Sequence, residues 1–239
     1  MTVLVVGVIL IALLVGVSAL QWLLRRREAG IERRMPHVGE LAELALPESN
    51  FPPEFSIDYR GPMTNERLAQ GTDDEAATLD ELDEQGRVIG YRQRFRDPKS
   101  YGELADVLLN HTLRSGTQHR LYSIDISLYE DSEGASEAVN ETPPQPADAD
   151  SEGVPSTIRV ADIGTHSLDF AESVRSWSRM DEHDAEVQRK IEVRWRAGRL
   201  GCVVAGDSEP AGGIEASEVC RLAQIVQDRV RTSSISRDA

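Results

Sequence analysis

The only two thiols of the chain are Cys202 and Cys220. Cys202 falls in a segment typical of the last strand, and Cys220 falls in the helix after it. If that helix packs on that strand, the two sulfur atoms could come within disulfide range. A disulfide would indicate an oxidising compartment. The equal alternative is two thiols that behave as small hydrophobes, and two cysteines alone cannot form a closed zinc site.

A serine–histidine pair is the next candidate. His166 and Ser167 are neighbours in the sequence Gly-Thr-His-Ser, and hydrolases use such residue types as base and nucleophile. Neighbouring residues of a strand point to opposite faces, and the chain has no G-x-S-x-G turn. A structural role is therefore favoured over a hydrolase site.

The remaining polar candidates are one acidic cluster and two histidines. The cluster Asp181–Asp184 contains His183, but adjacent residues cannot all face one metal ion, so we predict a solvated loop. His111 and His119 are expected to be packed or at the surface. The chain lacks a phosphate-binding glycine loop, an H-E-x-x-H motif and a dinucleotide fingerprint. We therefore predict no catalytic residues, no metal and no cofactor.

Four aromatic side chains form the predicted contact area of the domain: Tyr91, Phe95, Tyr122 and Trp195. They fall in predicted strands or next to loops, where they could meet a partner. Such aromatics also build cores, and that is the alternative.

The elements that must hold these residues follow from hydrophobic periodicity. Residues 120–129 alternate and predict a strand with Ser123 and Asp125 on one face and Ile124 and Ile126 on the other. Further strands are predicted at 86–96 and within 159–170, and a hairpin at 187–196 and 200–205 with its turn at 197–199. Helices are predicted at 37–46, 101–113, from about 130 onward, and at 214–231. The class is α+β, with an antiparallel sheet and packed helices, preceded by one N-terminal transmembrane helix.

The start of the chain predicts that membrane anchor. Thr2–Leu24 carries no charge, and its length as a helix spans a hydrocarbon core of roughly 30 Å. No basic region precedes it, so an uncleaved signal-anchor is favoured over a cleaved signal peptide. Arg25–Arg27 follow it, and the positive-inside rule then places the domain in the cytoplasm. The predicted location is the cell membrane, single-pass, with the lipid bilayer as one partner.

Composition and length bound the rest. The chain has 239 residues, 40% hydrophobic and 28% charged, with a net charge of −15, and this acidity argues against nucleic acid as a partner. No spaced acidic calcium loop occurs. The predicted organisation is an anchor and juxtamembrane helix at 1–36, one domain at 37–232 and a tail at 233–239. Residues 140–155, rich in Pro, Ala, Asp, Glu and Ser, are predicted to be a mobile insert.

Several phrases resemble a group of bacterial secreted or membrane-tethered domains. They are ELALPESNFPPEFSIDYRGPMTNERLA, GRVIGYRQRF with SIDISLYEDSEGASEAV, DIGTHSLDF, and VRWRAGRLGCVVAG with EASEVCRLAQIVQDRV. Together they cover 41–230 and are similar to the PsbP-like and mycobacterial lipoprotein-like α/β sandwich. The chain departs from the pattern at Phe51-Pro-Pro-Glu, where Pro-x-Gly-Phe is usual. The resemblance implies that fold and an extracytoplasmic domain, whereas Arg25–Arg27 favour a cytoplasmic one. It implies no particular activity.

These observations favour a non-catalytic, single-pass membrane domain that binds a partner protein or small ligand at the membrane surface, with a slight preference for the extracytoplasmic side. The first alternative is an accessory or assembly subunit of a larger membrane complex, held mainly by its transmembrane helix. In either case a membrane or envelope protein is the expected partner. A hydrolase that uses His166 or Ser167 is the third hypothesis.

Overall fold

The computed structural model describes residues 37–97, 119–140, 157–162, 168–180, 186–209 and 213–235. The chain divides into two compact units, 1–39 and 40–239, and all the strands belong to the second unit. No helix within the described ranges is both long enough and apolar enough to cross a bilayer. The segment Thr2–Leu24 lies outside those ranges, so the anchor stays a prediction.

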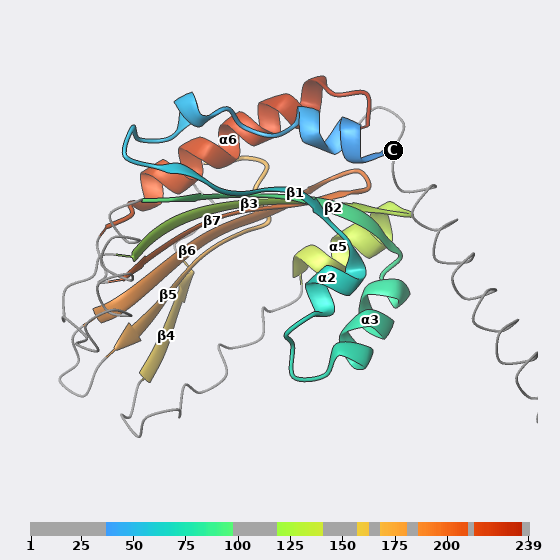
Figure 1. Ribbon diagram of the computed structural model, residues 1–239, viewed down its shortest axis with the longest axis horizontal. Coiled ribbons are helices and arrows are strands. Elements are labelled where there is room, and N and C mark those ends of the chain that lie inside the picture. The colour runs from blue at the N-terminus through green and yellow to red at the C-terminus, as the bar shows by residue number, and fades with distance from the viewer. Residues whose placement is uncertain are drawn as a thin grey trace, which may run out of the picture. The chain divides into compact units, whose positions relative to one another are not determined.

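A seven-stranded antiparallel sheet forms the centre of the described part of the chain, in the order β1-β2-β3-β7-β6-β5-β4 (Figure 1). The chain fills one side of the sheet with β1 to β3. It then crosses to the far edge with β4 and returns through β5 and β6, so that β7 pairs with β3. The strands are β1 Ser56–Met63, β2 Arg87–Arg96, β3 His119–Tyr129, β4 Thr157–Asp162, β5 Ser173–Met180, β6 Glu186–Ala197 and β7 Leu200–Glu209.

The central strand β3 gives the sheet two different faces. Its isoleucines Ile124 and Ile126 are buried, whereas Ser123 and Asp125 between them are partly exposed. Because side chains alternate along a strand, and because β2, β7 and β6 follow the same alternation in register, the face with Ile124 and Ile126 is mainly apolar and the opposite face is mainly polar. This confirms the alternation predicted for 120–129.

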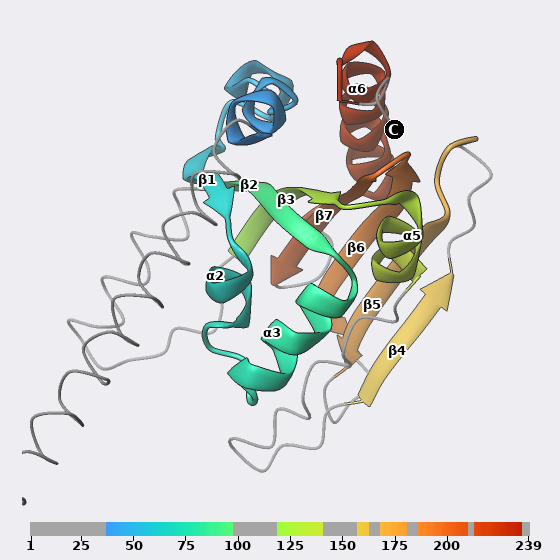
Figure 2. The same ribbon diagram turned by 90° about the vertical axis from the view of Figure 1, so that its right-hand side faces the viewer.

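The apolar face is covered by α6 (Ala216–Thr232) and by the N-terminal part of the domain, as Figure 2 shows. Val219, Leu222, Ala223, Val226 and Val230 of α6 are buried, as its amphipathic pattern predicts. Trp195 on β6 is fully buried, and its indole N–H donates to Gln227 of α6 at 2.8 Å. The ring of Phe51 stacks on Phe95 with 3.6 Å between centroids.

Side chains of the sheet and of α6 hold the segment 43–50, which ends in the short 3-10 helix η1 (Glu48–Asn50). Gln93 pairs with Leu46 as a strand would: it accepts from the Leu46 N–H at 2.7 Å and donates to the Leu46 carbonyl at 3.0 Å. Arg229 donates to the carbonyls of Glu43 and Ala45, at 3.1 and 2.5 Å. We call 43–50 the strap.

The polar face carries three helices at one end: α2 (Asn65–Ala69), α3 (Glu75–Glu84) and α5 (Ser132–Asn140). Buried Arg87 fixes α2 there, because it donates to the Asn65 side chain at 2.6 Å and to the Met63 carbonyl at 3.0 Å. α5 packs on the sheet beside Gly201, where an added Cβ would come into ordinary contact with Val139, at 3.5 Å. Away from these helices, the same face carries a pocket.

The α+β class with an antiparallel sheet and packed helices is confirmed. So are the hairpin, whose turn uses Gly198 at φ +60°, and the strands β2, β3 and β4. Three elements were not predicted from the sequence: the strands β1 and β5 and the helix α2. The predicted helix at 101–113 and the insert at 140–155 fall on residues that the structure leaves undescribed, except Asn140, which ends α5.

Candidate functional site

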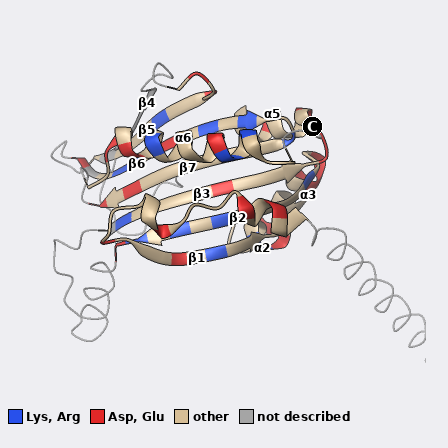
Figure 3. Ribbon diagram, turned by 90° about the horizontal axis from the view of Figure 1, so that it is seen from above, with Lys and Arg blue, Asp and Glu red and all other residues tan. Residues whose placement is uncertain are grey.

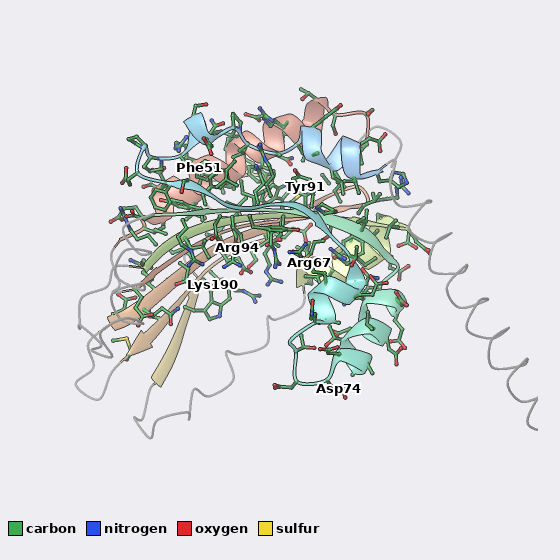
Figure 4. All side chains as sticks on the ribbon, in the orientation of Figure 1. Phe51, Arg67, Asp74, Tyr91, Arg94 and Lys190 are labelled. Carbon is green, nitrogen blue, oxygen red and sulfur yellow. The ribbon has the colours of Figure 1, made fainter. Side chains whose placement is uncertain are left out.

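A pocket of about 320 Å³ opens on the polar face of the sheet. It draws its walls from four neighbouring strands, and Figure 4 shows Arg94 and Lys190 on this face, opposite Phe51 and Tyr91. The lining residues are Arg92, Arg94, Leu121, Ser123, Asp125, Lys190, Ala205 and Asp207.

The floor of the pocket is low because small residues meet there. Ser123 of β3 lies directly opposite Arg94 of β2 and directly opposite Ala205 of β7. With longer side chains on the strands to either side, the two small residues leave a depression over the middle of the sheet. The pocket therefore follows from strand register, which joins residues far apart in the sequence.

Arginines of β2 form one wall. Arg92 makes an ion pair with Asp125, its neighbour on β3. Arg94 has a different environment: its side chain is 36% exposed, and its ion pair with Asp58 is long, at 3.8 Å. Basic positions recur along β2, and an acidic one lies midway along β3 (Figure 3).

Lys190 of β6 forms the opposite wall. Its ammonium group lies 3.0 Å from Glu192 and over the ring of Trp177, at 5.5 Å. Arg194 also pairs with Glu192, which is almost fully buried. Burial alone would raise the pKa of the Glu192 carboxyl, but the charges and hydrogen bonds of Lys190 and Arg194 outweigh it, so that pKa lies below its ordinary value. Glu192 is thus an ionised carboxylate that holds the Lys190 ammonium group in place by an ion pair.

Asp207 completes the rim. Its two oxygens accept hydrogen bonds from the Gln188 amide at 3.1 and 3.4 Å. Lys190 is its cross-strand neighbour. The pocket thus combines cations on both walls with two carboxylates that are already hydrogen-bonded. Within the described residues no group of three metal-ligating side chains forms a metal site.

The structure places the four predicted contact aromatics in the core. Tyr91, Phe95, Tyr122 and Trp195 are at most 9% exposed and face the side of the sheet under α6. Burial also raises the pKa of Tyr122. These side chains therefore pack the core and present no surface to a partner, because the apolar face of the sheet is the one that the helix covers.

The two cysteines are not bonded to each other. Cys202 is fully buried on the apolar face, and burial raises the pKa of its thiol; Cys220 is partly exposed on α6. Cys202 therefore behaves as the small hydrophobe of the alternative interpretation. His111, His166, Ser167 and Asp181–Asp184 lie outside the described residues, and His119 begins β3.

The pocket was not predicted from the sequence, although part of its signal is visible there. Ser123 and Asp125 share one face of their predicted strand, and Arg92, Arg94 and Arg96 alternate in the same way along RQRFR. A strand with arginines at every second position has one polar face. Which acids and small residues face those arginines depends on pairing that the sequence alone does not reveal.

No protein-family model and no curated protein sequence matches the chain. Solved structures resemble it at low similarity, two mycobacterial proteins among them. The extracellular domain of PknH from Mycobacterium tuberculosis is 12% identical with a TM-score of 0.42, over 81% of this chain and 96% of that one. An uncharacterised protein of Mycobacterium smegmatis, the Rv0999 ortholog, is 12% identical with a TM-score of 0.39, over 80% and 97%. Likeness at this level assigns neither a family nor a function, and none of these comparisons supports the PsbP-like part of the resemblance.

Proposed function

We propose that the chain is a membrane-anchored, non-catalytic domain that binds a small polar ligand in the pocket on the polar face of its sheet. The observation that carries this proposal is the pocket itself: about 320 Å³, lined by three cations and two carboxylates, over a floor of small residues. A concave site with a few convergent polar and charged groups is the default candidate for ligand binding.

The size of the pocket supports a small ligand over a protein partner. Ligand pockets hold roughly 300–1,000 Å³, and this one falls at the lower end. A stable protein interface buries about 800 Å² on each partner, with an apolar centre. The described part of the polar face has charges at that centre instead.

The anchor and the side of the membrane complete the proposal. Support for the anchor is the uncharged segment Thr2–Leu24. Support for the extracytoplasmic side comes from the sequence resemblance, while Arg25–Arg27 favour the other side. Protease protection of the full chain in sealed membrane vesicles of known orientation separates the two placements.

The binding proposal is tested with the full chain in detergent micelles and a panel of small polar metabolites, with the melting temperature as readout. A ligand at one hundred times its Kd stabilises the native state by about 2.7 kcal/mol. Ala205→Leu fills the floor of the pocket and should abolish the shift, whereas Ala205→Ser leaves the pocket open and should keep it. A shift that survives in the leucine variant would place binding elsewhere.

A further inference from the structure

Arg94 is the arginine of the pocket whose donors are unused. A guanidinium group has five N–H donors, yet Arg94 donates no hydrogen bond in the described structure, and its 3.8 Å approach to Asp58 is too long for one. The neighbouring Arg92 donates to Asp125. Elsewhere in the domain Arg87 and Arg229 donate to side chains or carbonyls. Arg94 therefore presents a guanidinium group with free N–H donors at the wall of the pocket.

Ser123 brings a second unused donor to the same place. It is the direct cross-strand partner of Arg94, so the two residues start about 5 Å apart. The Ser123 hydroxyl also makes no hydrogen bond in the described structure, and it lies on the pocket floor beside Ala205. Two N–H groups of a planar fork and one adjacent O–H match the oxygens of a carboxylate or a phosphate.

The charges around these donors favour an anion but limit its size. Lys190, which is also paired with Glu192, supplies a cation on the opposite wall, so the lining carries three cations and two carboxylates in a protein of net charge −15. Asp125 and Asp207 on the rim would repel a polyanion. A ligand with one oxyanion group, whose other polar groups are hydroxyl or ammonium donors, satisfies both conditions.

From this arrangement, and on the basis of the proposed function, we infer that the pocket recognises a carboxylate or phosphate group of its ligand through the Arg94 fork and the Ser123 hydroxyl. Lys190 contributes the second positive charge. Arg94 is therefore the residue that selects an acidic ligand over a neutral or cationic one.

Modification of arginines by phenylglyoxal, mapped by mass spectrometry on the full chain in micelles, tests this inference. Inorganic phosphate and acetate are the probes, with sodium chloride at equal ionic strength as the reference. We expect one or both probes to slow modification of Arg94 about fivefold or more, and the stronger of the two identifies the preferred oxyanion. Arg196, on the same face but paired with Glu172, is the internal control and should react at the same rate throughout.

Two variants then separate a specific site from general screening. Ser123→Ala should raise the probe concentration needed for half-protection of Arg94 by about three- to tenfold, because one hydrogen bond to a charged group is lost. Thr72→Ala, which removes an exposed hydroxyl from the α2–α3 connection, should leave it unchanged. Equal protection of Arg94 and Arg196, or no protection of either, overturns the inference.

The failure of the inference is distinguishable from that of the proposed function. Suppose that a metabolite without an acidic group stabilises the Ala205→Ser chain and not the Ala205→Leu chain. The pocket would then remain a binding site, but the inferred recognition of an oxyanion would be overturned. Absence of any pocket-dependent stabilisation, together with absence of protection, would overturn both.

Discussion

The two faces of the sheet are built from the same strands but differ in environment: one packs into the core and the other carries the pocket. On β7, Cys202, Val204 and Gly206 face α6 and lie in a packed core, while Ala205 and Asp207 line the pocket. Packing density makes the first set sensitive to every added or removed atom. The second set lines a recess on the opposite face of the sheet. The packed core and the proposed binding site are thus separated by one residue step along a strand.

The largest contrast is expected between the two tryptophans. Trp195→Ala should lower the free energy of unfolding by about 3–5 kcal/mol, because it empties a fully buried site and leaves Gln227 without its donor. Trp177 is the matched control, because it lies on the polar face with Lys190 over its ring. Trp177→Ala should lower the free energy of unfolding by about 1 kcal/mol or less. Urea denaturation measures both, and equal losses would break the comparison.

A single methyl group should distinguish the faces next. At Gly206 an added Cβ would lie 2.6 Å from Ile214 and 2.9 Å from Val219. Gly206→Ala should therefore destabilise the domain by about 1–3 kcal/mol through overpacking against α6. The adjacent Ala205→Ser adds one atom toward the pocket and should change the unfolding free energy by less than about 0.5 kcal/mol. If the two variants have the same urea midpoint, α6 does not pack on β7 as closely as described.

Glu192 sharpens the comparison because it is a buried charge on the polar face. Its folded-state pKa lies below the ordinary value, so on acidification the unfolded chain takes up the proton first. Its contribution is present above the ordinary glutamate pKa and is lost as the pH falls through the lowered one. Glu192→Gln should cost about 1–2 kcal/mol at neutral pH. The cost should shrink in acid, as urea titrations at a series of pH values will measure; a cost independent of pH would contradict the ion-pair explanation.

The smallest effect on stability belongs to Arg94. Because Arg94 makes no hydrogen bond in the described structure and one long ion pair, Arg94→Gln should change the unfolding free energy by less than about 0.5 kcal/mol. The same variant should no longer bind the carboxylate or phosphate group in the pocket. A large loss of stability measured in urea would mean that Arg94 is part of the framework of the fold, and its assignment to the pocket would fail.

The sequence predicted the elements whose local pattern matches their environment. β3 alternates strictly, α6 has one apolar stripe, and Gly198 marks the hairpin turn. β1 was missed because Gly61 and Pro62 are strand breakers in general. As an edge strand, β1 pairs only with β2 in the described sheet, so a residue without an N–H is tolerated.

The site was harder to predict than the fold because it depends on pairing between distant segments. β3 and β7 are adjacent in the sheet but separated by α5 and three strands in the chain. Only their register places Ala205 beside Ser123 and opens the pocket floor. The aromatic residues were predicted as a contact area from their residue type, but Phe95 and Trp195 are fully buried, because large apolar side chains contribute most to a core.

The strap has a mechanical consequence. Tension applied to the domain through its N-terminal end would reach residues 43–50 before it reached any strand. There it would meet hydrogen bonds from Gln93 and Arg229, and it would have to pull the buried side chains of Leu44 and Leu46 out of the core. Loss of the strap would therefore uncover the core on the apolar face, whereas the pocket lies on the opposite face of the sheet.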